Sequence, residues 1–321
     1  MKKMLVIAVV AALAAPAAVM ADTTLYGKLH VSVGSVDDGT KSETVVESHS
    51  SRIGIKGSTE LDNGMSATYG VEYGIDLDGD AEKANSTSRS LNARNTFVGV
   101  KGGFGEVRVG RHDTPGKLAT AGLDGFADTY ADMSNIIAAD GHRVDNAVAY
   151  INKFGPVGFA VAHSTETDLI PASADGDRNG GSEANTAMIN YGNGPWYAGL
   201  GYTEVDSTLK DTNLGLGWKA EAGHFANLVY EQVDYDGTPN DDTNAYVAGG
   251  FKTGAATLKV GYGESKTDNA GKEKQTTVGV DYSLGKKTSA YLLWNEDKNV
   301  AHSATTDIKS TQTVVGLVSE F

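Results

Sequence analysis

The chain has 321 residues, no cysteine and a formal net charge of −14 at pH 7. The lack of cysteine excludes a disulfide scaffold, a cysteine-ligated zinc site and a thiol nucleophile. A chain this acidic is also a poor nucleic-acid binder, and its length allows one large β domain or two smaller ones.

The N-terminus has the pattern of an export signal. Two lysines precede an apolar run over residues 4–20, and the small residue Ala21 stands before an aspartate. The run is short for a membrane span and has no charged stop behind it, which disfavours a membrane anchor. We therefore predict a signal peptide over residues 1–21 and a mature domain over 22–321.

Segments with alternating apolar and polar side chains follow from the first strand to the last. The segment 25–33 places its leucines and valines on one face, and the segment 52–56 opposes isoleucines to Arg52. This period of two is typical of half-apolar strands. Beyond the signal, no apolar stretch is long enough for a spanning helix, so a membrane location requires a closed barrel, because lipid cannot satisfy an open strand edge.

The predicted connections alternate between two lengths. Short turns rich in Gly, Asn and Pro are expected at residues 62–64, 102–103, 155–156, 193–195, 221–223, 253–254 and 285–286. Longer polar loops are expected near residues 34–43, 76–92, 113–141, 164–184, 205–211, 235–243, 264–274 and 296–309. This alternation predicts an all-β, 16-stranded antiparallel transmembrane β-barrel with both termini on the short-turn side, as in bacterial outer membranes. A soluble sandwich gives no reason for such alternation.

The third long loop, residues 113–141, is the longest and the least strand-like. Sixteen strands leave an aqueous channel whose size needs a device to set it. A loop of this length in a compact domain usually has a function. The stretches 117–123 and 126–133 could include a short helix. We predict that the loop folds into the barrel and narrows it.

Several motifs in the chain have a recognisable pattern. They are TLYGKL at 24–29, SRIGIKG at 51–57, FVGVK at 97–101, FGEVRVGRHDTP at 104–115, RVDNAVAY at 143–150, and the terminal Phe321. Together they resemble the Gram-negative trimeric porin family over essentially the whole mature chain. One departure is the Ser319-Glu320 pair before Phe321, where the family often carries more basic or apolar residues.

The resemblance implies a homotrimer in the outer membrane of a Gram-negative bacterium, with a water-filled channel for passive diffusion of ions and small hydrophilic solutes. Lipopolysaccharide, outer-membrane lipid and the barrel-assembly machinery are the other expected partners, with Phe321 as the assembly signal. The alternative is an outer-membrane barrel that acts mainly as an adhesin or surface receptor. The moderate loops and the absence of a preceding plug domain in this sequence disfavour that alternative.

The resemblance also implies a pore constriction between inward arginines and acids of the third loop. Arg52, Arg94 and Arg143 are expected on the basic side. Strand alternation independently supports Arg52 and Arg143, since the apolar residues at 53, 55, 144 and 148 lie on the opposite face. Arg94 is less well supported, because it shares its face with Val98 and Val100.

On the acidic side we expect Asp124, Asp128 and Asp132, whose four-residue spacing would place them on one face of a helix. Opposed charges across a pore orient polar solutes and set ion preference. The alternative is a solvated acidic loop surface. The acidic total favours cations and the arginines favour anions; the sequence leaves selectivity open, with a slight preference for cations.

Metal sites and catalysis are both disfavoured by the sequence. Residues 175–180 match the start of a calcium loop, but the twelfth position is Thr186 rather than glutamate. The acids at 76, 78 and 80 form a similar cluster, and we interpret both as exposed turns. His112 and His142 are the nearest candidates for catalysis, yet no nucleophile motif accompanies them. We predict no metal, no cofactor and no enzymatic activity.

Overall fold

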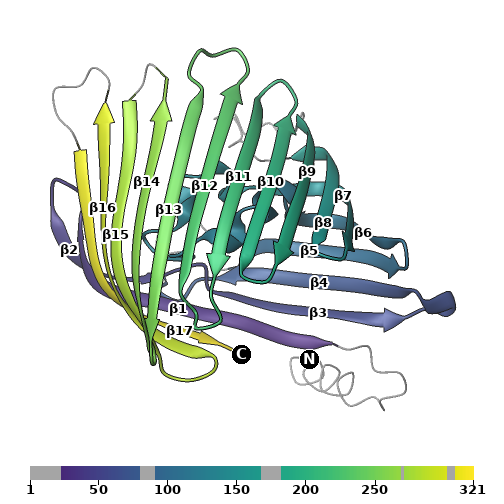
Figure 1. Ribbon diagram of the computed structural model, residues 1–321, viewed down its shortest axis with the longest axis horizontal. Coiled ribbons are helices and arrows are strands. Elements are labelled where there is room, and N and C mark those ends of the chain that lie inside the picture. Colours follow the sequence, from purple (N-terminus) through teal and green to yellow (C-terminus); the bar gives the residue numbers. More distant parts are fainter. Residues whose placement is uncertain (1–22, 80–90, 168–181, 269–270, 302–307) are drawn as a thin grey trace, which may run out of the picture.

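The computed structural model describes residues 23–79, 91–167, 182–268, 271–301 and 308–321. The predicted signal peptide and the calcium-loop motif at 175–180 lie outside these ranges. Most described residues belong to one antiparallel sheet that closes on itself (Figure 1). Its strands are β1 (Thr24–Asp37), β2 (Ser42–Ser48), β3 (Arg52–Glu60), β4 (Ser66–Ile75), β5 (Leu91–Gly102), β6 (Gly105–Asp113), β7 (Arg143–Phe154), β8 (Val157–Thr167), β9 (Ser182–Asn193), β10 (Trp196–Val205), β11 (Leu209–Lys219), β12 (Phe225–Tyr235), β13 (Asp242–Thr253), β14 (Ala256–Thr267), β15 (Gly271–Ser283), β16 (Thr288–Ala301) and β17 (Ile308–Glu320).

The 17 strands make sixteen passes around the barrel. Both β2 and β3 pair with β1, so they are two parts of one pass, separated by a break at residues 49–51. Ser50 in this break has a φ of 47°, which turns the chain between the two parts. The predicted 16-stranded barrel is confirmed.

The last strand closes the sheet onto the first. β17 pairs with β1 from Lys28–Glu320 to Asp37–Thr311, which leaves neither strand with a free edge. Beyond β17, the Phe321 amide donates to the Gly27 carbonyl oxygen at 3.1 Å, and the Gly27 amide donates to the Phe321 backbone oxygen at 3.3 Å. The C-terminal residue therefore lies beside the start of β1, on the short-turn side.

The outer connections are less uniform than predicted. The first spans only residues 38–41 and the fifth only 206–208. Polar strand ends extend past the expected loop boundaries here, and their composition resembles that of a loop. In the turn between β3 and β4, a 3-10 helix (Asp62–Gly64) contains Asn63 with a φ of 62°.

The outer face of the barrel is apolar, and the inner face is polar except where apolar clusters pack near the third loop. Exposed Leu, Ile and Val side chains alternate along most strands with buried His, Ser, Thr, Asn, Gln and Glu. Exposed aromatic residues stand beside short turns, namely Phe154, Trp196, Phe251 and Tyr282. An apolar band with aromatic borders is what a lipid-embedded barrel requires. None of the described helices is long and apolar enough to cross a membrane.

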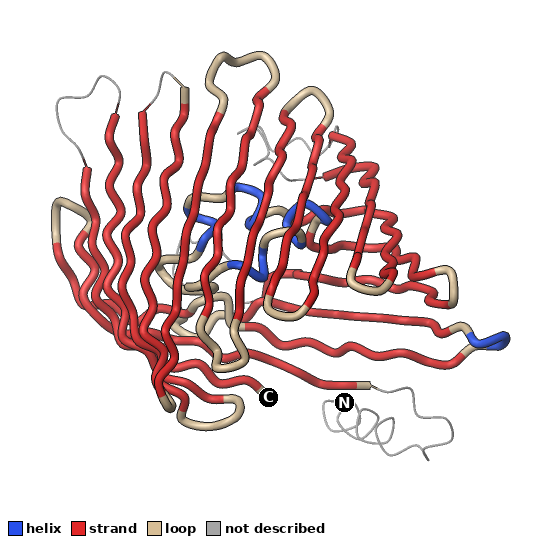
Figure 2. Tube along the Cα trace, in the orientation of Figure 1, coloured by secondary structure: helices blue, strands red, loops and turns tan. Residues whose placement is uncertain are grey.

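The third loop, residues 114–142, lies inside the barrel, as predicted (Figure 2). It contains α2 (Pro115–Leu118) and three 3-10 helices, η3 (Ala121–Leu123), η4 (Met133–Asn135) and η5 (Ala138–Gly141). Thr114 caps α2, because its Oγ1 accepts from the Lys117 amide at 3.0 Å, and Pro115 occupies the first turn. Residues 124–132 form no helix.

The largest apolar core lies between this loop and the barrel wall. Leu123, Met133 and Ile137 of the loop pack against Val229 and Tyr246 of the wall. A barrel of sixteen strands is too wide for wall side chains alone to fill. The loop therefore supplies the apolar surface that one side of the interior would otherwise lack.

Candidate constriction inside the barrel

Inward glycines on the wall give the third loop room to approach. A Cβ on Gly199 would press directly against the carbonyl oxygen of Ala119, and one on Gly201 would lie 2.6 Å from the Gly116 oxygen. Gly215 likewise lies under the Leu123 side chain. Because any larger residue would collide with the loop, glycine at these places permits the loop's close contact with β10 and β11. We call the inner face of β10–β14 the covered wall.

Polar side chains of the covered wall hold the loop backbone. Carbonyl oxygens of the loop accept hydrogen bonds from four of them: Tyr197 to Ala119 at 2.8 Å, Asn213 to Gly116 at 3.2 Å, Asn227 to Leu123 at 2.8 Å, and Lys259 to Gly125 at 2.8 Å. The Glu231 carboxylate accepts the amides of Ala138 and Ala139, both at 2.8 Å. These bonds satisfy backbone groups that the loop would otherwise bury unpaired.

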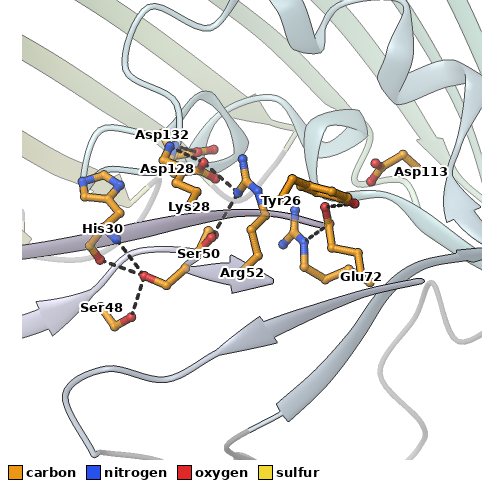
Figure 3. A network of polar contacts seen from close by, with 12 residues as sticks. Tyr26, Lys28, His30, Ser48, Ser50, Arg52, Glu72, Asp113, Asp128 and Asp132 are labelled. Atoms are coloured by element: carbon orange, nitrogen blue, oxygen red, sulfur yellow. Dashed lines mark hydrogen bonds and ion pairs between the residues drawn. The ribbon is translucent and has the colours of Figure 1, made fainter. Parts of the chain in front are cut away.

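At its tip the loop turns an acid toward β1 and β3. Asp128 has a φ of 58°, a left-handed conformation that is uncommon for a residue with a side chain. Its Oδ2 lies 2.7 Å from Lys28 Nζ and 2.9 Å from Arg52 Nη1 (Figure 3). Burial acts to raise the pKa of Asp128, but Lys28 and Arg52 outweigh it and hold that pKa below its ordinary value.

Arg94 faces the interior because of a bulge in β5. The register with β4 shifts between Val71 and Tyr73, because β5 carries one extra residue there. The alternation of β5 before this bulge therefore has the opposite parity to that of Val98, which faces outward. The Arg94 Nε then donates to Glu72 Oε1 at 2.6 Å, and Glu72 also accepts from Tyr26. The bulge explains why Arg94 faces inward although alternation in the sequence groups it with Val98 and Val100.

Arg143 also reaches the interior, but by a different route from the one its sequence predicted. Val144 is only 1 % exposed and packs in an inner cluster, whereas Val148 is 49 % exposed on the outer face. A register shift beside Asn146, whose φ is 48°, separates the two valines. The alternation argument for Arg143 was therefore wrong, although its Nη2 donates inside the barrel to Asp113 Oδ1 at 2.6 Å.

Arg94 and Arg143 border a recess of about 480 Å³ that is lined by residues of β2, of the break before β3 and of β4–β7. Its charged lining comprises Arg94, Arg111, Arg143, Glu47, Asp76 and Asp78. Arg111 pairs with Asp145 across β6 and β7. We call the inner face of β1 and β3–β6 the open wall. It carries basic and acidic groups in close pairs rather than an arginine row alone.

Asp124 and Asp132 are engaged within the loop itself. The carboxylate of Asp124 accepts the amides of Phe126 at 2.7 Å and Met133 at 3.0 Å, and the Tyr246 hydroxyl at 3.1 Å. Asp132 accepts the amides of Asp128 at 2.6 Å and Ser134 at 2.8 Å. Since no helix spans 124–132, the three predicted acids do not share a helical face, and among them Asp128 meets Arg52.

The two histidines considered for catalysis and the acidic cluster around Asp78 make contacts that support the fold. The His112 ring stacks on Phe97 with centroids 5.5 Å apart, and His142 Nδ1 lies 3.5 Å from Asp211 Oδ2. Asp78 accepts the Ser48 amide at 2.6 Å and so braces the break before β3.

Sequence reasoning missed Lys28 and the whole covered wall. Lys28 alternates with the apolar Leu25 and Leu29, so its inward direction was readable from parity. Repeated glycines at alternate positions in β10, β11 and β14, as in Gly199-Leu-Gly201 and Gly215-Leu-Gly217, were the signal for a backbone-packing surface.

Comparison with known proteins agrees with this geometry. The sequence profile described as Gram-negative porin matches residues 7–302. The major outer membrane protein P.IB of Neisseria sicca is 27% identical, covering 91% of this chain and 92% of that protein. The same protein from a serogroup A strain of Neisseria meningitidis is 28% identical with equal coverage.

Solved porin structures share the fold. The anion-selective porin from Comamonas acidovorans superimposes with a TM-score of 0.73 at 20% identity, covering 94% of this chain and 100% of that one. OmpF of Salmonella typhi gives a TM-score of 0.71 at 16% identity, covering 94% and 98%. With this match over most of its length, the chain belongs to the Gram-negative porin family: it is a non-enzymatic outer-membrane channel for general diffusion.

Proposed function

We propose that solute passage through this porin is controlled where the tip of the third loop faces the open wall. The observation that most directly supports this proposal is the contact of Asp128 with both Lys28 and Arg52. It joins the loop to the opposite wall and leaves the recess beside Arg94, Arg111 and Arg143 as the polar path. Asp124 and Asp132 support this arrangement by holding the loop backbone.

The charges along this path nearly balance. Arg94 pairs with Glu72, Arg143 with Asp113, and Arg111 with Asp145, while Asp128 shares two cations. Paired charges create a transverse field that orients water and polar solutes without strongly excluding either ion sign. We propose weak selectivity, with a slight preference for cations from the acidic chain as a whole.

Planar-bilayer recordings of the wild type and Asp128→Asn test this proposal. Removing the acid leaves Lys28 and Arg52 unbalanced, so the reversal potential in a salt gradient should shift toward anions. Lys210→Gln, at an exposed outer strand end, is a control that should not shift it. An unchanged reversal potential and conductance for Asp128→Asn would contradict the assigned constriction.

We also propose that the protein works as a homotrimer. A structurally similar porin, OmpT of Vibrio cholerae, has a trimer form; its TM-score is 0.66 at 15% identity. Migration of unheated and heated protein on a gel, with light scattering in detergent, tests this. A single-barrel mass under mild conditions would contradict it.

Lipopolysaccharide and the barrel-assembly machinery remain proposed partners, with Phe321 as the assembly signal. The backbone pairing of Phe321 with Gly27 places its side chain at the barrel seam. Phe321→Ala should therefore reduce the yield of folded barrels more than it changes the conductance of those that form. Normal yields from that variant would count against the signal.

A further inference from the structure

Three carboxylates from separate turns of the third loop converge beside its tip. Asp124 follows η3, Asp132 caps η4, and Asp140 lies within η5. One oxygen from each carboxylate lies within 4.8 Å of the others. We call this group the loop triad. The predicted constriction involved two of its members, but Asp140 was no part of that prediction.

The hydrogen bonds of the triad leave acceptor capacity unused. Among the residues that the structure describes, Asp124 Oδ2 accepts only from Met133, and Asp132 Oδ2 accepts only from Asp128. Asp140 is 8 % exposed, and its carboxylate accepts no hydrogen bond from any residue that the structure describes. Its oxygens are not among the fully buried unpaired atoms, so a small ion or water can reach them, and one of them is directed at the other two carboxylates.

The charge of the triad is also uncompensated by direct contact. Within the described ranges, no lysine or arginine forms an ion pair with any of its three members. A cation among the three would balance their negative charge.

We propose that the loop triad binds one divalent cation, with Ca²⁺ as the best fit. Ca²⁺ takes six to eight oxygen ligands at about 2.3–2.6 Å, so oxygens on opposite sides of the ion lie about 4.6–5.2 Å apart. The spacing of the triad matches this limit, and water would complete the coordination. Three hard oxygen ligands favour Ca²⁺ over softer transition metals.

Such a cation would influence the pore through one hydrogen bond. The same Asp132 carboxylate that belongs to the triad accepts the Asp128 amide at 2.6 Å. It thereby helps to hold Asp128 in the left-handed conformation that points its side chain at Lys28 and Arg52. This consequence rests on the proposed constriction, whereas cation binding itself does not.

Terbium luminescence in detergent tests the site without any channel measurement. The Tyr246 hydroxyl lies 3.1 Å from Asp124 Oδ1, so excitation of tyrosine should sensitise Tb³⁺ held by the triad. After EDTA treatment, we expect one saturable site per chain that Ca²⁺ displaces. Asp140→Asn should weaken this site at least tenfold, while the exposed Asp234→Asn, which removes the same charge, should leave it intact.

A second readout uses the wild type alone. Ca²⁺ should raise the thermal unfolding midpoint of the EDTA-treated protein by a few degrees, because a ligand bound only to the folded state stabilises it. Equal Tb³⁺ binding by wild type and a folded Asp140→Asn, or no Ca²⁺ effect on the wild type, would overturn the proposal. Cation binding with unchanged currents would instead contradict only its coupling to the constriction.

Discussion

The covered wall and the open wall are inner faces of the same sheet, yet they use opposite chemistry. On the covered wall, glycines such as Gly199 and Gly201 bring the loop backbone into contact, and amide, hydroxyl and carboxylate groups bind it. On the open wall, Lys28, Arg52 and Arg94 extend long charged side chains toward acids. One face fixes the loop and the other presents charge to water.

This difference separates what holds the loop from what the loop does. Contacts on the covered wall are short and made largely to backbone atoms, so they depend on shape and on complete hydrogen bonding. Contacts on the open wall are ionic and partly hydrated, so salt screens them. Changes on the covered wall should therefore alter stability and loop position, whereas changes on the open wall should alter ion flow.

The largest expected effect comes from Gly199→Ala on the covered wall. The new Cβ would press on the Ala119 carbonyl, so the loop must shift or the strand must bend. We expect a loss of about 1–3 kcal/mol in stability, typical of overpacking, together with altered single-channel conductance. The matched control is Gly249→Ala on β13, where a Cβ would meet nothing nearer than 3.7 Å. If the two variants behaved alike in thermal unfolding and in bilayer recordings, close packing of the loop against Gly199 would not matter, and the role assigned to the covered wall would be wrong.

A second change on the covered wall is Glu231→Gln. The side chain is fully buried and accepts two loop amides and the Asn244 side chain. The neutral amide keeps one acceptor oxygen and turns a donor toward the other amides. We expect a loss of about 1–3 kcal/mol, the usual cost of an unsatisfied buried group. Thermal unfolding with the exposed Glu221→Gln as control measures it, and equal midpoints would show that Glu231 is no anchor.

The contrast between the two walls also explains how far sequence could predict this molecule. The barrel, its sixteen passes, the inward third loop and the direction of Arg52 follow from alternation and loop length, which are local and regular. The direction of Arg94, and that of Val144 beside Arg143, depend on bulges that insert one residue and reset parity. Nothing in a period-two pattern marks where such a bulge falls.

The shared helical face expected of Asp124, Asp128 and Asp132 does not form, for a second physical reason, although short helices occur elsewhere in the loop. Asp124 accepts the amide of Phe126, and Asp132 accepts that of Ser134, each two residues onward. Such local side-chain bonds compete with the helical hydrogen-bond ladder. The acids whose spacing pointed to a helix are the residues that form turns instead. Which turn they form depends on contacts with distant strands, such as Tyr246, that the local sequence does not reveal.

On the open wall, Arg52→Gln should change ion flow with little loss of stability. Lys28 still neutralises Asp128, so the loop tip keeps one of its two ionic contacts. One positive charge leaves the constriction, and the reversal potential should shift toward cations. Gly199→Ala serves as the contrasting variant, since its main effect is on unfolding. A large drop in the Arg52→Gln unfolding midpoint would show that the open wall also holds the loop.

The smallest expected effect is the dependence of these changes on salt. Screening shortens the reach of a fixed charge from about 10 Å at 0.1 M salt to about 3 Å at 1 M. The selectivity difference between wild type and Arg52→Gln should therefore shrink as salt rises, because permeating ions farther than one contact from the side chain no longer sense it. The stability loss of Gly199→Ala should persist at every salt concentration, because steric overlap is not screened. Recordings and unfolding curves at both concentrations compare the walls directly. A selectivity difference that stays constant to 1 M would mean that Arg52 acts on ions in direct contact or by changing the shape of the pore, and the division between a shape-dependent wall and a charge-dependent wall would fail.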